Sequence, residues 1–179
     1  MKLRLLFSML TVAALLGPHV GVAADQAEQP SNPLDVVPEK MPFNTPYGPP
    51  ISLQRAQALA QAAVAEATKH GWPLNVAVVD SGGNLIAFLR MDGAQLASIS
   101  ISEHKARAAV KFRRPTKAFE DAIQKSDYKY MLTLDDVIAS RGGIPLIEAG
   151  KIIGGIGCSG ATSSQDEVVC AAAAATIGK

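Results

Sequence analysis

The stretch "IPLIEAGKIIGGIGCSG", residues 144–160, decides the fold of this chain. Two β-rich runs, residues 144–148 and 151–158, flank the tetrapeptide "EAGK". Short apolar runs around a glycine-containing turn are typical of an antiparallel hairpin, because glycine readily adopts the positive φ of a tight turn. A capping-box pattern, "SQDE" at residues 164–167, then opens an alanine-rich helix at residues 165–176. We therefore expect a hairpin that leads directly into a helix.

The hexamer "GIGCSG", residues 155–160, matches the G-x-G-x-x-G pattern of loops that bind dinucleotides. That function requires the first strand of a parallel βαβ unit and an acidic residue about 20 positions further on. Here only 19 residues follow Gly160, and none after Glu167 is acidic. The glycines of residues 154–157 instead leave one face of the strand nearly bare, so that a helix, a ligand or another subunit can approach closely.

The rest of the domain continues in the same style. The apolar spacing and the turn residues predict a helix capped by Ser52 and Gly71, followed by a hairpin of strands 74–79 and 85–91. They also predict a helix at 97–112 and a shorter helix that is capped by Thr116 and extends to residue 123. Residues 128–140 are expected to be irregular or a short helix. Strands that come in hairpins favour an antiparallel sheet. The predicted fold class is α+β, a single domain with an antiparallel sheet of about four to five strands flanked by helices.

The N-terminal segment has the pattern of a secretory signal peptide. Lys2 and Arg4 precede a short apolar run, and "VAA" at residues 22–24 fits the small-residue cleavage rule. We interpret residues 1–24 as a signal peptide, with an uncleaved membrane anchor as the alternative. Cleavage predicts a periplasmic or secreted protein with no remaining membrane span.

Residues 25–50 contain seven of the eleven prolines of the chain and have no helical or strand periodicity. We expect a proline-rich extended arm, either a spacer or a strap on the domain, with Phe43 and Tyr47 as its anchors. The domain proper is predicted at residues 51–179.

The charge of the chain is small. The formal net charge is +1, and it becomes −1 when Lys2 and Arg4 leave with the signal peptide. Nothing in this balance predicts nucleic-acid binding.

Two cysteines, Cys158 and Cys170, fall at the end of the last predicted strand and in the last helix. In an oxidising compartment they can form a disulfide if the helix packs over the strand. The alternative is two small, buried apolar side chains.

Three blocks of the sequence carry a family resemblance: "VAVVDSGGNLIAFLRMDGA", "KARAAVKF" and "GGIPLIEAGKIIGGIGCSGATSSQDE". Together they resemble the GlcG/HbpS family of small haem-binding proteins and are similar to the C-terminal domain of PduO cobalamin adenosyltransferases. The resemblance implies an antiparallel sheet flanked by helices, haem as a cofactor, and a homo-oligomer built from dimers, up to an octamer. In the family pattern, the position before Ser159 is not usually the cysteine found here, Cys158.

The resemblance points to haem storage, scavenging or redox sensing, and His104 is the candidate ligand to the haem iron. Imidazole is a common axial haem ligand, and cations beside it can pair with the propionates of haem or with a small anionic ligand. The candidate cofactor-binding residues are His104, Lys105, Arg107, Lys111, His70, Gly157, Ser159 and Gly160. For His70, a cation in the last turn of a helix also has a purely structural explanation.

Two other classes of function stay open. The first is an isomerase or tautomerase of a small carboxylated metabolite, in which Asp80 and Lys105 would act as the acid–base and anion-binding pair. Asp80 also fits an ordinary turn. No G-x-S-x-G motif supports a hydrolase, and the cysteines and histidines lack zinc spacing. The second class is a ligand-free accessory protein of a sensor or transport system.

Overall fold

A computed structural model describes residues 33–177 of the chain. The chain divides into two compact units, residues 1–39 and residues 40–179. The described part of the first unit contains one 3-10 helix, η1 (Pro33–Asp35), and all other elements belong to the second. The predicted signal peptide lies outside the described residues. Within residues 33–177, none of the helices has the length and apolarity that a bilayer crossing requires.

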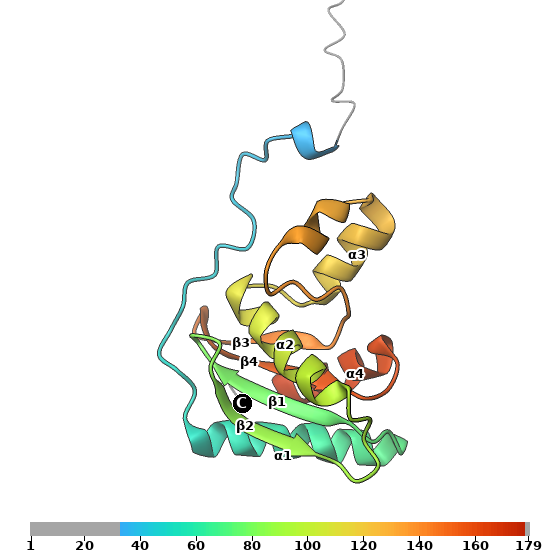
Figure 1. The fold of residues 1–179 in the computed structure, drawn as a ribbon. Helices are drawn as coiled ribbons and strands as arrows, with labels where there is room; N and C mark the ends of the chain where they lie inside the picture. Colours follow the sequence, from blue (N-terminus) through green and yellow to red (C-terminus); the bar gives the residue numbers. More distant parts are fainter. Residues whose placement is uncertain (1–32, 178–179) are drawn as a thin grey trace, which may run out of the picture. The chain divides into compact units, whose positions relative to one another are not determined.

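The core of the second unit is a four-stranded sheet of β1 (Asn75–Asp80), β2 (Leu85–Arg90), β3 (Gly143–Glu148) and β4 (Lys151–Ser159), shown in Figure 1. The strand order is β2-β1-β4-β3, and every neighbouring pair is antiparallel. Both predicted hairpins are present, and the β1–β4 pairing joins them. The predicted α+β class is confirmed, with four strands.

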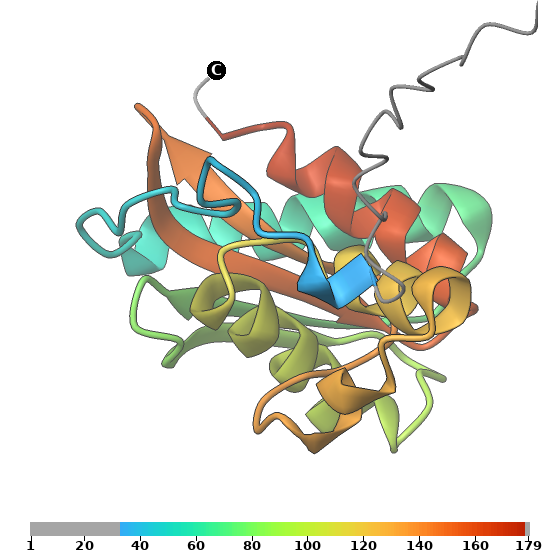
Figure 2. The ribbon, with the colours of Figure 1, turned by 90° about the horizontal axis from the view of Figure 1, so that it is seen from above.

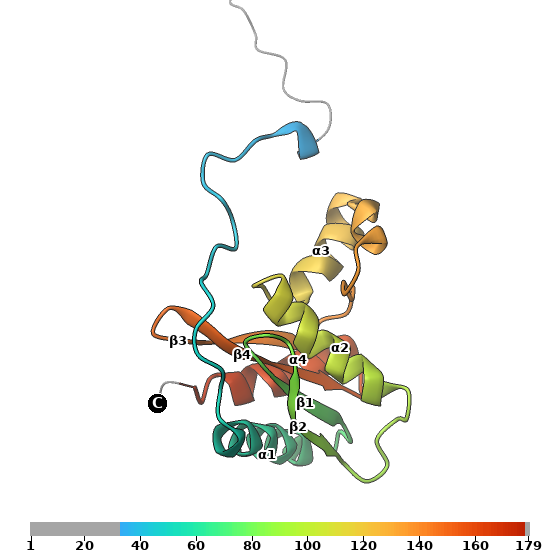
Figure 3. The same ribbon diagram turned by 60° about the vertical axis from the view of Figure 1, so that its left-hand side comes forward.

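The helices form one layer on each face of this sheet (Figures 2 and 3). They are α1 (Leu53–His70), α2 (Ser98–Lys111), α3 (Lys117–Ser126) and α4 (Ser163–Ala174), with a short 3-10 helix η2 (Lys129–Thr133) after α3. Helices α1 and α4 cover one face, and α2 lies alone on the other. A separate apolar cluster of Ala108, Phe119 and Met131 holds α3 and η2 against α2.

The predicted N-cap residues are confirmed at α1 and α3, and the predicted N-cap of α4 is wrong. The hydroxyl of Ser52 caps α1, and Gly71 ends it at φ 68°. The predicted capping box at α4 is wrong by two residues: Thr162 is the N-cap, and its reciprocal partner is Gln165. Thr116 is the N-cap residue of α3, as predicted, but its side chain makes no capping hydrogen bond: the hydroxyl accepts one from the backbone N–H of Gly143 at 2.9 Å instead.

Three glycines of β3 and β4 face α2: Gly143, Gly155 and Gly157. A Cβ atom added to Gly157 would lie 2.1 Å from the carbonyl oxygen of Ser102, and one on Gly143 would lie 2.2 Å from that of Lys105. Gly155 would meet the side chain of Val110 at 2.6 Å. The bare strand face therefore serves the close approach of a helix, one of the roles expected from the sequence.

The arm between residues 40 and 50 lies as a strap on the second unit. Gly48 donates a backbone hydrogen bond to Ile152 of β4, so the arm continues the sheet beyond the end of β1. The hydroxyl of Tyr47 donates to the carbonyls of Val110 and Lys111 at the end of α2, both at 3.1 Å. The guanidinium groups of Arg113 and Arg114 stack over the rings of Tyr47 and Phe43, respectively, so both predicted anchors make contact.

Candidate functional site

His104 lies on the side of α2 that does not carry the tightest contacts with the sheet. Its Nε2 atom is buried and has no hydrogen-bond partner within residues 33–177. Buried polar atoms in folded proteins nearly always have a partner, so an unpartnered imidazole nitrogen is a candidate ligand atom. Arg107 and Lys111 follow His104 by three and seven residues, and helical geometry places all three on the same side of α2.

A carboxylate from the loop after η2 meets this side of α2. Asp136 forms an ion pair with Lys111 in which Oδ2 and Nζ are 2.5 Å apart. The hydrogen bond from Lys111 holds the pKa of Asp136 below its usual value. Partial burial opposes that shift, and the charges of Lys111, His104 and Arg107 reinforce it. The aliphatic stems of Lys111 and Arg107 lie next to Gly83 in the turn between β1 and β2.

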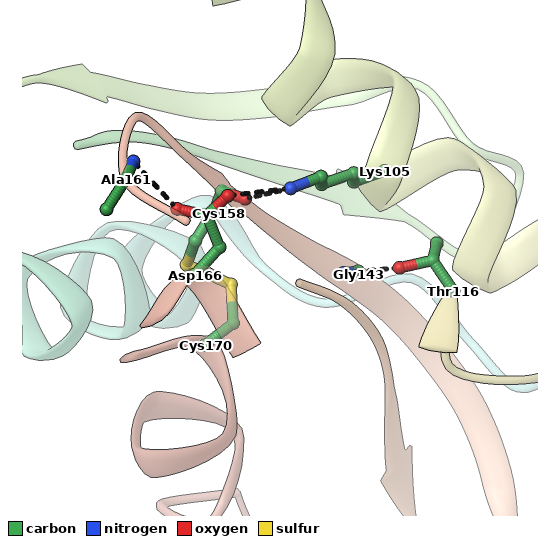
Figure 4. Close-up of a disulfide and its surroundings, with 7 residues drawn as sticks. All are labelled: Lys105, Thr116, Gly143, Cys158, Ala161, Asp166 and Cys170. Carbon is green, nitrogen blue, oxygen red and sulfur yellow. Dashed lines mark hydrogen bonds and ion pairs between the residues drawn. A yellow bond between two sulfur atoms is a disulfide. The ribbon is translucent and has the colours of Figure 1, made fainter. Parts of the chain in front are cut away.

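Lys105 points the other way, into the interior between α2 and the end of β4 (Figure 4). Its ammonium donates to the carboxylate of Asp166 at 2.8 Å and to the carbonyl of Cys158 at 3.2 Å. Burial lowers the pKa of Lys105 and raises the pKa of Asp166, while the ion pair opposes both shifts. Only 1% of the Lys105 side chain is exposed, so this cation holds elements together rather than facing a ligand.

Cys158 and Cys170 form a disulfide with an S–S distance of 2.07 Å and a Cα–Cα distance of 5.7 Å (Figure 4). The bond joins β4 to α4, beside the Lys105–Asp166 pair. The Oδ1 atom of Asp166 also accepts the backbone N–H of Ala161 at 3.1 Å. Together these contacts fix the loop that connects β4 to α4.

Asp80 and Lys105 are not brought together. Asp80 aligns with Gly154 in the sheet, whereas Lys105 reaches Cys158, about 13 Å further along β4 at the usual rise per residue. Partial burial acts to raise the pKa of Asp80, but the N–H donors of Asn84 and of the turn outweigh this effect and hold the pKa below its usual value. A carboxylate saturated in this way is a weak general base.

The other candidate residues lie apart from His104. His70 is exposed; it stacks on Trp72 with ring centroids 4.3 Å apart and contacts Glu66 at 3.2 Å. Gly157 and Ser159 are buried in β4. Gly160 has φ 153° in the loop that leads to α4. The structure thus brings together His104, Arg107 and Lys111 out of the predicted set.

Two cavities of about 490 and 410 Å³ lie elsewhere, between α1 and the free edge of β2. Their walls include Gln61 and Leu89 and contain no histidine. We place the candidate site at His104 despite the size of these cavities. His104 has the unpartnered Nε2 atom, and the charged side chains of Arg107, Lys111 and Asp136 lie on the same side of α2. No cluster of three or more His, Cys, Asp or Glu side chains that could hold a metal ion occurs in residues 33–177.

Two acidic residues that pair with the lysines of α2, Asp136 and Asp166, could not be singled out from the sequence. Asp136 lies in a stretch without periodicity, and its pairing with Lys111 depends on how that loop folds back. Asp166 was visible only as part of a helix-capping pattern. Its burial opposite Lys105 follows from the packing of α4 and α2 around the end of β4.

The family model described as "Haem degrading protein HbpS-like" matches residues 51–175. The protein GlcG of Escherichia coli (strain K12) is 39% identical to this chain over 109 residues, which are 61% of this chain and 81% of GlcG.

Solved structures agree with these matches. A double mutant of Streptomyces reticuli HbpS superposes with a TM-score of 0.69 at 31% identity, covering 80% of this chain and 97% of HbpS. The crystal structure of a PduOC–haem complex gives a TM-score of 0.65 at 30% identity, covering 72% of this chain and 96% of the other. The family model covers most of the chain, and the fold agrees at these identities. The chain therefore belongs to the HbpS-like family.

Proposed function

We propose that this protein binds haem and that His104 supplies an axial ligand to the iron. The observation that carries the proposal is the buried Nε2 atom of His104, which lacks a hydrogen-bond partner within residues 33–177. The similarity to a PduOC–haem complex and to HbpS supports haem as the ligand. Because Nε2 is covered, ligation requires the side chains around it to move aside.

The residues beside His104 suit the rest of a haem molecule. Arg107 and Lys111 are cations at one and two helical turns from the imidazole, where they can pair with the propionates. Bound haem would supply a redox-active iron, and an axial imidazole would contribute to its potential. His104 would hold the iron, and the two cations would orient the porphyrin edge.

A hemin titration of the full chain tests this proposal, with the Soret band as readout. His104→Ala is the test variant and His70→Ala is its matched control, since His70 is the other histidine of the described chain. We expect saturable binding by the wild type and by His70→Ala, and a weaker, shifted band for His104→Ala that added imidazole partly restores. No saturable band in the wild type, or an unchanged band in His104→Ala, would overturn the proposal.

We propose further that the protein acts outside the cytoplasm, in haem storage, scavenging or redox sensing. The signal-peptide pattern of residues 1–24 and the Cys158–Cys170 disulfide support an oxidising compartment. N-terminal sequencing of the protein from the periplasm or medium is expected to begin at Asp25. Recovery of the full-length chain in the cytosol alone would contradict this.

The family description names haem degradation, which is the second candidate. The same hemin complex, followed in air with ascorbate as reductant, distinguishes the two. A stable Soret band favours binding, whereas its progressive loss with release of iron favours degradation. The homo-oligomer expected from the resemblance stays a prediction, which light scattering of the purified chain tests.

A further inference from the structure

The carboxylate of Asp136 meets α2 at Lys111, on the same side of the helix as Arg107 and His104. It forms the 2.5 Å ion pair with Lys111, and the charges of His104 and Arg107 also act on it. One other carboxylate shares these cations: Glu103 lies 3.6 Å from Arg107 within the same helix. Lys111 thus pairs with a carboxylate that comes from outside the helix, and the charges of Arg107 and His104 favour the ionised form of that carboxylate.

The segment of the loop up to Asp136 is weakly held, whereas Val137 and Ile138 after it pack against the cluster of Ala108, Phe119 and Met131. Asp136 adopts φ 65°, a left-handed conformation that aspartate tolerates better than most residues. The flanking backbone hydrogen bonds are long: Leu134 donates to Met131 at 3.3 Å, and Val137 donates to Leu134 at 3.4 Å. Leu134 and Asp135 are exposed. The ion pair with Lys111 is itself partly exposed, with 44% and 34% of the two side chains accessible. Such a contact is easily exchanged for a similar one.

We propose that His104, Arg107 and Lys111 form a carboxylate-binding site that Asp136 fills when no ligand is bound, and that a ligand carboxylate displaces Asp136 from Lys111. The side chain of Asp136 then acts as an internal competitor, and the loop after η2 moves away from α2 as the ligand enters. This inference deepens the proposed function and rests on it for the identity of the ligand, a tetrapyrrole that carries propionates. Only molecules in which Asp136 has left the site can bind such a ligand. The apparent affinity for the ligand therefore falls in proportion to the fraction of molecules with an open site.

The first experiment uses succinate as a haem-free carboxylate probe on the full chain. The imidazole signals of His104 are followed by NMR, with those of His70 as the internal reference. Asp136→Asn is expected to respond at succinate concentrations about two- to fivefold lower than the wild type, as expected for the loss of an exposed ion pair. The matched control is Asp135→Asn. It makes the same change in charge one residue away, at an exposed side chain with no ion pair in the described chain, and it should respond like the wild type.

The second experiment compares hemin with hemin dimethyl ester, in which both propionates are blocked. Asp136→Asn should raise the affinity for hemin about two- to fivefold and leave the affinity for the ester unchanged. Lys111→Gln should lower the affinity for hemin and again leave the ester unaffected.

Three results would overturn the inference: an equal succinate response of the wild type and Asp136→Asn, an equal gain in Asp135→Asn, or an equal gain in affinity for the ester. Failure of the proposed function is a separate result. If the His104 signals respond to succinate as expected while hemin does not bind the wild type, haem is the wrong ligand and the carboxylate site stands.

Discussion

Replacement of Gly157 by alanine tests whether the bare face of β4 serves the packing of α2. The added methyl group would lie 2.1 Å from the carbonyl oxygen of Ser102 and 2.6 Å from the backbone nitrogen of Ala106. Ordinary contacts begin at 3.4 Å, so α2 and β4 must separate by roughly 1.3 Å at this point. Both neighbouring atoms belong to the helix backbone, which cannot turn aside as a side chain can.

The size of the effect follows from two opposing contributions. Insertion of a methyl group into a filled interior destabilises proteins by about 1–3 kcal/mol, occasionally more. The smaller entropy of alanine in the unfolded chain contributes about 0.4–1 kcal/mol in favour of the variant. The severe backbone overlap places Gly157→Ala at the upper end of the range of about 1–3 kcal/mol of destabilisation. We expect the free energy of unfolding to fall by about 2–3 kcal/mol in total, which corresponds to roughly 10 °C in melting temperature.

Chemical denaturation with guanidinium measures this loss, and two variants calibrate it. Gly155→Ala meets the movable side chain of Val110 at 2.6 Å and should lose less. Gly82→Ala, in an exposed turn, meets the end of the Asn84 side chain at 3.0 Å and should change stability least. A Gly157→Ala variant as stable as the wild type, but with altered ligand affinity, would refute the reasoning and assign the bare strand to a ligand.

Three further predictions concern the disulfide, the arm and one carboxylate of α3. The double variant Cys158→Ala/Cys170→Ala should lose about 3 kcal/mol of unfolding free energy, since the disulfide closes a loop with a sequence separation of 12, and equal guanidinium midpoints would contradict this. Tyr47→Phe removes the hydroxyl that holds the arm on α2 and should cost about 0.5–1.5 kcal/mol, with faster proteolysis at residues 40–50 as the readout. The hydrogen bond from Lys117 lowers the pKa of Asp121 to about 2 from 3.8, so the contribution of Asp121 to stability is complete above pH 4 and is lost as the pH falls towards 2. An NMR titration midpoint of Asp121 near 3.8 would contradict that.

Much of the fold could be predicted because local signals agree with the final packing. The turn at Gly150, the cap at Ser52 and the Gly71 terminus are all determined within a few residues, and each lies where the sequence indicated. The misplaced capping box at Ser164 and the absence of a side-chain cap at Thr116 have the opposite cause. A hydroxyl has several partners within reach, and the one that Thr116 binds, Gly143, is 27 residues away.

The candidate site was less predictable than the fold. Helical spacing alone groups His104, Arg107 and Lys111 on one side of α2, and that grouping could be read directly. The same basic run includes Lys105, whose side chain turns inward to Asp166. Only the position of α2 on the sheet distinguishes an inward lysine from an outward one. The role of Asp136 depends on the path of an aperiodic loop, for which the sequence contains no periodic signal.

The place of β4 in the sheet has a consequence for the order in which the molecule can be completed. This strand touches β1, β3 and α2, yet its residues, 151–159, follow all three of them in the chain. Until β4 is in place, the β1–β2 hairpin and α2 lack the strand against which they pair and pack. The disulfide can only follow that step, because its cysteines lie in β4 and in α4. The arrival of β4 is thus the step that completes the sheet of this domain.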